Sequence, residues 1–288
     1  MSITEITKEN VNAYTDHFPA DFADEIEREY YRGLVGEDEE TSDVTAVVFW
    51  ELRNAEDDNL QTEAEILWFS AKNAEDGAAL LKEIEEVPEV DDVKRLYYEM
   101  SEIGSVEQEA FSAAGFSAQE AEGRDVCVTV EELSKLKLSL SKIPDYIKPL
   151  KEISSQQFKA GIMTSVFHGK YGLLEDLPFL PITRFDPDLS CCMITDEKVN
   201  ALLLVHQDKT GTLRVELLFA MQPDANVHLL NMMRYAIRTA SGIRSPEDRV
   251  LLRRHNKATV QLVGKLFPGR KGASVVRGDK RCTHEQLF

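Results

Sequence analysis

The chain is poor in the residues that mark disulfide-rich and metal-binding proteins. Its 288 residues contain four cysteines, Cys127, Cys191, Cys192 and Cys282, which are too few and too scattered for a disulfide framework. The adjacent pair is sterically awkward to bridge to itself. No two histidines lie at ligand spacing, and neither a CxxC nor an HExxH motif occurs, so no metal site is predicted. We expect reduced thiols, with Cys191 and Cys192 packed in an apolar strand.

The sequence also lacks long apolar runs. None approaches the roughly 18 residues of a membrane-spanning helix, and the first residues show neither the basic region nor the apolar stretch of a signal peptide. These absences predict a cytoplasmic protein with no membrane partner. Apolar residues make up 43% and charged residues 29% of the chain, which excludes a disordered or collagen-like protein. The length suits two domains of about 130 to 160 residues each.

Basic residues are scarce in the first half. Residues 1–130 contain 9 Lys and Arg against 34 Asp and Glu, a net charge of −25, whereas residues 131–288 contain 24 against 17, a net charge of +7. The first half therefore repels nucleic acid, and the second can attract an anionic small ligand or dock against its acidic neighbour. The most basic stretch is 244–281, with 11 basic and 3 acidic residues. Nucleic-acid binding is disfavoured there, because interleaved aromatic residues are missing.

Hydrophobic periodicity predicts the same order of elements twice, about 150 residues apart. The first half is predicted to form a helix over 18–34, strands over 45–52 and 63–70, a helix over 74–87, a strand over 93–100, a helix over 106–114 and a last strand over 124–130. The second half is predicted to form a helix over 154–166, strands over 190–195, 201–206 and 213–221, a helix over 226–240, a strand over 249–254 and a helix over 257–266.

The two sets of elements indicate a duplicated domain. Residues 65–68 match 216–219 at an offset of 151, and residues 49–54 match 203–208 at an offset of 154. We therefore expect an acidic domain over 1–135 and a second domain over 136–288. Their junction lies around 131–153, where alternating leucines at 136, 138 and 140 suggest a strand. Ser154 and Gln157 have the spacing of a capping box at the start of the next helix.

This order of elements resembles the GNAT superfamily of acyl-CoA N-acyltransferases, and Gln108 to Phe116 (QEAFSAAGF) is similar to a helix signature of that family. The resemblance implies an α/β protein with two tandem GNAT-like domains, each a mixed, mostly antiparallel sheet flanked by helices. It also implies an enzyme that transfers an acyl group from acetyl-CoA or another acyl-CoA to an amine of a small molecule or a protein. The alternative is a non-catalytic GNAT-fold binding or interaction module.

The resemblance also implies where acyl-CoA would bind. In the family its pyrophosphate meets the start of the helix after the fourth strand, where free N–H groups and the helix dipole favour anions. The first half has Glu75 and Asp76 there, so we expect that half to be degenerate. The second half is the candidate, with cofactor contacts at Phe219, Met221, Gln222, Asp224, Ala225, Asn226, Val227, Arg253, Arg254 and Asn256. Asp224 or Asn226 is equally explained as a helix cap, and the arginines as surface charges.

Catalysis in the family needs a base for the amine proton and an acid for the leaving thiolate. Glu216 is the candidate base, because a carboxylate flanked by apolar residues is partly desolvated. The alternative is a solvent-facing strand residue. The tyrosine that often serves as the acid is replaced by Phe111 in the first half and by about Val263 in the second. Water, Tyr235 or His255 would then protonate the thiolate.

Overall fold

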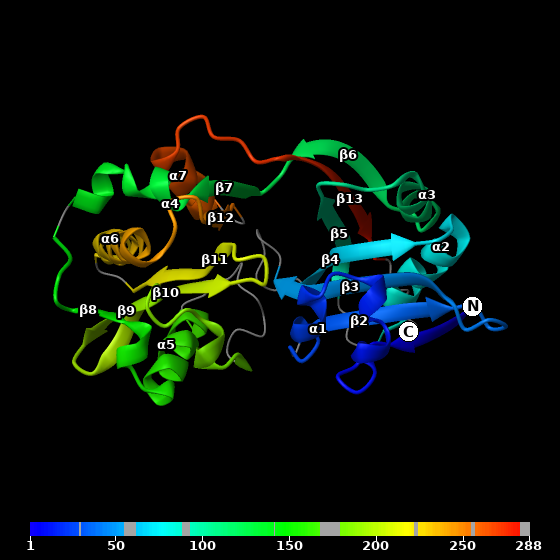
Figure 1. The fold of residues 1–288 in the computed structure, drawn as a ribbon, viewed down its shortest axis with the longest axis horizontal. Coiled ribbons are helices and arrows are strands. Elements are labelled where there is room, and N and C mark those ends of the chain that lie inside the picture. Colours follow the sequence, from blue (N-terminus) through cyan, green and yellow to red (C-terminus); the bar gives the residue numbers. More distant parts are fainter. Residues whose placement is uncertain are drawn as a thin grey trace, which may run out of the picture. The chain divides into compact units, whose positions relative to one another are not determined.

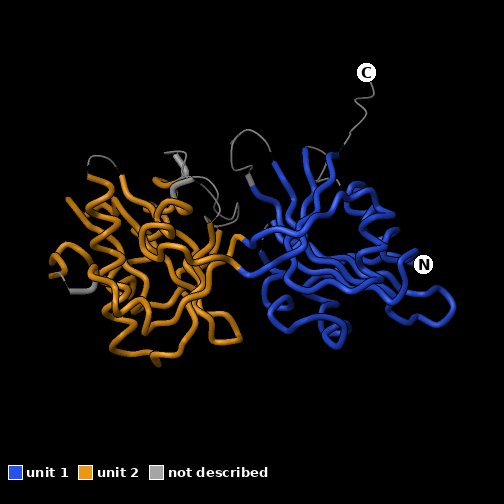
Figure 2. Tube along the Cα trace, turned by 90° about the horizontal axis from the view of Figure 1, so that it is seen from above, with its two compact units in different colours: residues 1–123, 273–288 blue, residues 124–272 orange. Residues whose placement is uncertain are grey.

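The computed structural model describes residues 1–28, 30–54, 62–87, 93–140, 142–167, 179–221, 224–254 and 257–282. The chain forms two compact units (Figure 2): unit 1 comprises residues 1–123 and 273–288, and unit 2 comprises residues 124–272. This division differs from the boundary expected at residue 135. Unit 1 has 11 basic against 35 acidic residues, a net charge of −24, and unit 2 has 22 against 16, a net charge of +6. The charge asymmetry therefore follows the observed units.

Unit 1 is built on one mixed sheet with the strand order β1-β2-β3-β4-β5-β13-β6. The strands are β1 (Ser2–Glu5), β2 (Tyr31–Glu37), β3 (Val44–Asn54), β4 (Thr62–Ala71), β5 (Val93–Met100), β6 (Ser117–Glu122) and β13 (Ser274–Arg281). All neighbours are antiparallel except β4 and β5. The strands predicted over 45–52, 63–70 and 93–100 are confirmed. The turn expected between β3 and β4 lies outside the described residues.

Helices cover both faces of the unit 1 sheet. One face buries an apolar cluster under α2 (Ala74–Glu83), the short turn η3 (Ile84–Glu86) and α3 (Ser105–Ala113). The other face packs against α1 (Asp21–Glu25) and two short turns, η1 (Val11–Ala13) and η2 (Thr15–His17). The helix expected over 18–34 is wrong. Only α1 forms there, because Tyr31 and Leu34 are buried as residues of strand β2.

Unit 2 has a second mixed sheet with the order β7-β12-β11-β10-β9-β8. Its strands are β7 (Asp125–Thr129), β8 (Ile147–Pro149), β9 (Cys191–Thr195), β10 (Lys198–Gln207), β11 (Leu213–Ala220) and β12 (Arg249–Arg253). Only β11 and β12 are parallel among the pairs described. One face carries α4 (Val130–Ser134), α6 (Ala225–Ile243) and α7 (Lys257–Leu266), and the other carries α5 (Ser155–Phe167) (Figure 1).

Local signals in unit 2 are mostly confirmed. The capping box at α5 is present, since the Gln157 N–H donates to Ser154 Oγ at 3.2 Å and the Ser154 N–H donates to Gln157 Oε1 at 3.0 Å. The strand expected around residues 136–140 is wrong. These residues form a 3-10 helix, η5 (Lys137–Leu140), and the short turns η6 (Leu150–Glu152) and η8 (Ile182–Arg184) also went unpredicted. No helix in the described part of the chain is long and apolar enough to span a membrane.

The two units exchange strands. The strand predicted over 124–130 exists as β7, but it pairs with β12 of unit 2 and not with the sheet that precedes it in sequence. In return β13, near the end of the chain, lies between β5 and β6 of unit 1 (Figure 1). Neither β6 nor β13 was predicted, because both are short of the alternating apolar residues that mark a half-buried strand. Each sheet is thus completed by a distant segment.

Gly278 in β13 gives a test of this strand insertion. A Cβ atom at Gly278 would overlap the ring of Tyr98, which is fully buried and stacked on Phe111 with ring centroids 3.9 Å apart. Because that ring has no room to move, we expect Gly278→Ala to destabilise unit 1 by about 3 kcal/mol in chemical denaturation. Gly242→Ala in α6 is the matched control, since a Cβ there meets nothing within 4 Å. Equal effects of the two changes would contradict the observed register.

Candidate active site

The parallel strand pair in each unit separates part of the way along the sheet. In unit 1 the β4–β5 ladder ends at Ile66 and Tyr98. In unit 2 the β11–β12 ladder comprises Leu213 with Val250 and Arg214 with Leu251, and no further pair is found between the described residues of these strands. Both strands continue beyond that point, so backbone groups of β11 on its β12 side lack ladder partners there. Such groups need another partner, which a bound ligand can provide.

A β-bulge marks the same point in both units. In unit 1 the register of β3 against β4 skips Leu67, and in unit 2 the register of β10 against β11 skips Glu216. The extra residue reverses the alternation of side chains, so that Leu213 and Leu218 of β11 reach the same apolar cluster although they are five residues apart. The bulges are 149 residues apart, close to the expected offset of 151. Bulges are enriched beside active sites, which fits a functional position for Glu216.

Aromatic rings fill the space beyond the bulge in unit 1. Phe69 of β4 contacts Phe111 of α3 with ring centroids 4.9 Å apart, and Phe111 stacks on Tyr98 of β5 at 3.9 Å. Phe111 also meets Phe116 at 5.2 Å. Tyr98 and Phe111 are fully buried. Stacked and edge-to-face rings pack tightly, so aromatic side chains of the protein itself cover the separating strands of unit 1 on the face under α3.

The start of α2 in unit 1 is closed to anions as well. The Asn73 side chain caps the helix, accepting from the Asp76 N–H at 2.8 Å, and Glu75 and Asp76 place two carboxylates in the first turn. At the end of β4, the Ala71 N–H donates to the Glu107 carboxylate at 3.4 Å. The Glu107 carboxylate thus already accepts from a backbone N–H at the end of β4, where an anionic ligand would otherwise bind. These contacts disfavour phosphate binding in unit 1.

Unit 2 has small aliphatic residues at the corresponding places. Counting from the bulges, Leu218 matches Phe69 and Leu252 of β12 lies close to the position of Tyr98, while the inward residue of α7 is Val263. Leu218 and Leu252 are half-buried and Val263 is buried. No ring contact is found between β11, β12 and α7 among the residues described. Aromatic packing like that of unit 1 is therefore not found where β11 and β12 separate, among the residues described.

The first turn of α6 differs from that of α2 in its charge. Asp224 occupies the N-cap position of α6, as the alternative interpretation expected, in a left-handed conformation with φ of 66° and without a side-chain cap bond. The first turn contains no acidic residue. Ala225 is buried, whereas Asp224, Asn226 and Val227 are exposed. Gln222 of the predicted loop lies outside the described residues.

Other predicted contacts are already engaged within unit 2. The Met221 N–H donates to the Asn200 carbonyl at 3.0 Å, and Phe219 is buried on the α5 side of the sheet. Arg253 lies 3.9 Å from the Asp125 carboxylate, and the Arg254 Nε–H donates to the Arg124 carbonyl at 3.2 Å. Arg253 is the last residue of β12 and Arg254 follows it, although both were predicted within the strand; both are half-buried. Asn256 lies outside the described residues.

The candidate acid–base residues are not all close together. Glu216 is half-buried at the bulge, so it is not the fully solvent-facing residue of the alternative interpretation. The Tyr235 hydroxyl donates to the Asp188 carbonyl at 3.0 Å, next to β9, which lies two strands from β11. Burial raises the pKa of Tyr235. His255 lies outside the described residues. Glu216 and Tyr235 therefore lie on different parts of the sheet, and the role of Glu216 as the base stays a prediction.

The paired cysteines are poor nucleophiles, as expected from their apolar strand. Cys191 and Cys192 are buried in β9. Burial raises the pKa of Cys192 to about 12 and that of Cys191 well above its usual value. Because the thiolate is the reactive form, neither side chain is reactive near neutral pH.

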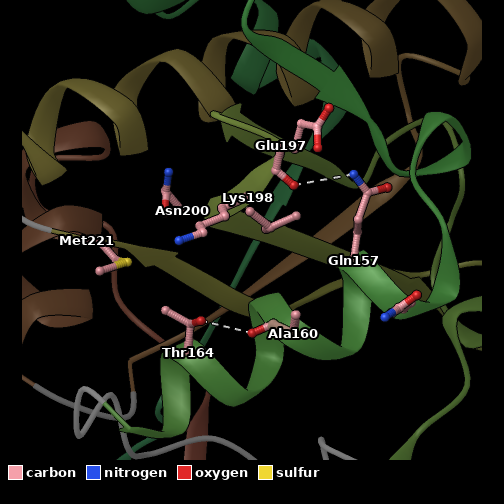
Figure 3. A pocket seen from close by; sticks show the side chains of 9 residues that line it. Gln157, Ala160, Thr164, Glu197, Lys198, Asn200 and Met221 are labelled. Atoms are coloured by element: carbon pink, nitrogen blue, oxygen red, sulfur yellow. Dashed lines mark hydrogen bonds between the residues drawn. The ribbon is translucent and has the colours of Figure 1, made fainter.

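Sequence reasoning missed a pocket of about 620 Å³ on the α5 side of unit 2 (Figure 3). Three segments line it: one face of α5, the turn before β10 with the start of that strand, and the end of β11. The lining residues are Gln156, Gln157, Ala160, Thr164, Glu197, Lys198, Val199, Asn200 and Met221. Of these only Met221 was a predicted site residue. The spacing of 156, 160 and 164 is typical of one helix face, but nothing local ties it to β10.

No protein-family model and no curated protein matches the chain. Solved structures do resemble it. A tandem GNAT protein from the clavulanic acid biosynthesis pathway has a TM-score of 0.57 at 9% identity, over 98% of this chain and 99% of that one. A conserved protein of unknown function from Enterococcus faecalis V583, described as a probable N-acyltransferase, has a TM-score of 0.55 at 13% identity, over 97% of this chain and 72% of that one.

A third similar structure is a GCN5-related N-acetyltransferase from Anabaena variabilis, with a TM-score of 0.50 at 12% identity, over 97% of this chain and 72% of that one. At these identities the likeness concerns the fold. The chain therefore has a tandem GNAT fold of two mixed sheets flanked by helices, and the resemblance seen in its order of elements is confirmed. GNAT-fold acetyltransferases among the similar structures support a general acyl-transferase fold.

Proposed function

We propose that the chain is an acyl-CoA-dependent N-acyltransferase that binds acyl-CoA in unit 2 and uses unit 1 as a non-catalytic partner. The observation that carries this proposal is the contrast between the separating strands of the two units. Phe69, Phe111 and Tyr98 cover the separating strands in unit 1, whereas Leu218, Leu252 and Val263 lie there in unit 2. The net charge of +6 on unit 2 also suits an anionic ligand.

The residues of unit 2 fit an acyl-CoA in their chemistry. The unpaired side of β11 beyond Arg214 offers backbone groups to the pantetheine amides, and the first turn of α6, free of acidic residues, offers N–H groups to the pyrophosphate. Arg253 and Arg254 add positive charge nearby in sequence. Phe219 and Met221, with Ala225, Asn226 and Val227, would contribute mainly through their backbone. When bound, acyl-CoA supplies an acyl group activated as a thioester.

Glu216 would then act on the acceptor. Its carboxylate takes a proton from the attacking amine as the new C–N bond forms and the C–S bond breaks. Half-burial at the bulge keeps the carboxylate partly desolvated and holds it in one place on the strand. The acceptor is an amine of a small molecule or a protein.

Titration with acetyl-CoA tests the cofactor part of this proposal. A ligand that binds only the folded state raises stability by about 2.7 kcal/mol at 100 times its dissociation constant. We expect a rise in melting temperature with acetyl-CoA and none with acetate alone. Leu218→Phe, which places in unit 2 the ring that Phe69 supplies in unit 1, should abolish the rise.

Phe69→Leu is the matched control for that variant. It opens the packing in unit 1 and lowers the melting temperature of the free protein, but the additional rise on adding acetyl-CoA should stay as in the unmodified chain. A rise lost with Phe69→Leu and kept with Leu218→Phe would move the site to unit 1. No rise with acetyl-CoA in any variant would favour the non-catalytic binding module.

A further inference from the structure

The pocket on the α5 side of unit 2 has a rigid frame. Gln157 is committed to the capping box through Oε1, and its Nε2 donates to the Glu197 carbonyl at 3.5 Å. The turn before β10 has Asp196 and Glu197 both at positive φ, 52° and 63°, which is the two-residue turn that closes a tight hairpin. The turn therefore fixes Lys198 as the first residue of β10, opposite α5.

Three donors of the pocket have no protein partner among the described residues: the Lys198 ammonium group and the side-chain amides of Asn200 and Gln156. Figure 3 shows the Lys198 ammonium group on the same side of the pocket as Asn200 and Met221, while the Glu197 carboxylate points away from it. The Thr164 hydroxyl donates to the Ala160 carbonyl at 2.9 Å, which leaves it as an acceptor.

The rest of the lining is mixed: Gln156 and Gln157 are polar, Glu197 carries a carboxylate, and Ala160, Val199 and Met221 are apolar. Val199 is buried, and Ala160 and Met221 complete a surface without charge. The volume of about 620 Å³ lies within the roughly 300 to 1,000 Å³ of small-molecule sites, so a bare ion would leave most of it unfilled. The pocket thus combines one exposed ammonium group, several side-chain amides and an apolar wall, and the Glu197 carboxylate belongs to its lining but points away from Lys198.

We propose that this pocket binds a small organic carboxylate, with its carboxylate group at Lys198 and Asn200 and its carbon chain against Val199, Ala160 and Met221. One ammonium group matches the single charge of a carboxylate and makes charge-assisted hydrogen bonds to it. Phosphate sites instead favour arginine forks or clustered backbone N–H groups, which this pocket does not contain among its lining residues.

The site goes beyond the proposed acyl transfer. It shares only Met221 with the proposed acyl-CoA site. The pocket residues belong to the α5 side of the sheet, whereas α6 and α7 cover the opposite side, and Glu216 does not line it. Binding there needs no acyl-CoA. A carboxylate in this pocket therefore acts as a second ligand of unit 2, close in sequence to the segment that leads from β11 into α6.

Hexanoate is a suitable probe, and methionine methyl groups labelled with ¹³C report where it binds. In the full chain without acyl-CoA, we expect the Met221 signal to shift and saturate at millimolar hexanoate, while Met163, exposed on α5 outside the pocket lining, does not move. Hexanamide, which has the same chain and no charge, should produce no comparable shift. Lys198→Met should weaken hexanoate binding at least tenfold, because it keeps the stem and removes the charge.

Lys159→Met is the control, since Lys159 is exposed on α5 and does not line the pocket. It should leave the affinity for hexanoate unchanged. The proposal is overturned if hexanoate leaves Met221 unmoved, if Lys198→Met binds as well as the unmodified chain, or if inorganic phosphate binds as tightly as hexanoate. Because the titration omits acyl-CoA, its result is separate from that of the acetyl-CoA test.

Discussion

Replacing Glu51 by Gln is expected to lower the free energy of unfolding of unit 1 by about 3 to 5 kcal/mol. The Glu51 carboxylate is 2% exposed and joins two arginines, with Arg28 NH2 at 2.6 Å and Arg53 NH2 at 2.9 Å. Arg53 also lies 2.8 Å from Glu65, whose carboxylate accepts from the Tyr97 hydroxyl at 3.2 Å. The variant leaves Arg28 paired with Glu25 and Arg53 with Glu65, but it breaks two charge-assisted hydrogen bonds of a buried carboxylate, each of which contributes about 1.5 to 3 kcal/mol.

Chemical denaturation measures this effect, and Glu27→Gln is the matched control. Glu27 pairs with Lys8 at 2.6 Å, but the two side chains are 57% and 69% exposed. Exposed pairs contribute little because water and salt screen them. The control should therefore change the free energy of unfolding by no more than the experimental error. Similar losses for the two variants would show that the network around Glu51 is not buried as the structure has it.

Glu216→Gln is expected to lower turnover at least about 100-fold while leaving the affinity for acetyl-CoA nearly unchanged. A general base contributes roughly 10² to 10⁴ to a rate, and the amide of Gln cannot accept the amine proton. The bulge places Glu216 where the two parallel strands separate, away from the first turn of α6 that would meet the phosphates. Steady-state kinetics and an acetyl-CoA titration on the same variant separate the two quantities.

Glu63→Gln is the control for that variant. Glu63 is half-buried on the corresponding strand of unit 1 and lies 3.3 Å from Arg95. We expect its turnover to match that of the unmodified chain. If Glu216→Gln keeps the rate, water or another residue takes the proton.

Much of the fold could be predicted because its signals are local. Strand β5 and helix α7 begin and end where periodicity placed them, and the capping box at Ser154 and Gln157 is present. The repeated order of elements was sufficient to suggest a tandem GNAT fold. The helix expected over 18–34 is wrong because apolar residues spaced by four fall in a short helix, a buried strand and the segments between them.

Partners of strands could not be predicted in the same way. Strand β7 was located correctly but assigned to the wrong sheet, and β13 was missed, since its charged and glycine residues show no apolar alternation. Pairing depends on residues far apart in sequence. Gly278, for example, lies against the Tyr98 ring, and this close approach is possible only because glycine has no side chain. The bulge at Glu216 belongs to the same class, because a skipped residue is defined only against its neighbouring strand.

The sequence by itself determined the type of most elements and the uneven charge, because periodicity and composition act within short stretches of chain. The tertiary structure alone decided which strands complete each sheet, that aromatic rings cover β4 and β5 where they separate, and that Lys198, Asn200 and Met221 line one pocket. These features depend on packing between segments that only folding brings together. A side chain's chemistry is readable from its type, but the groups that it meets are set by the whole sheet.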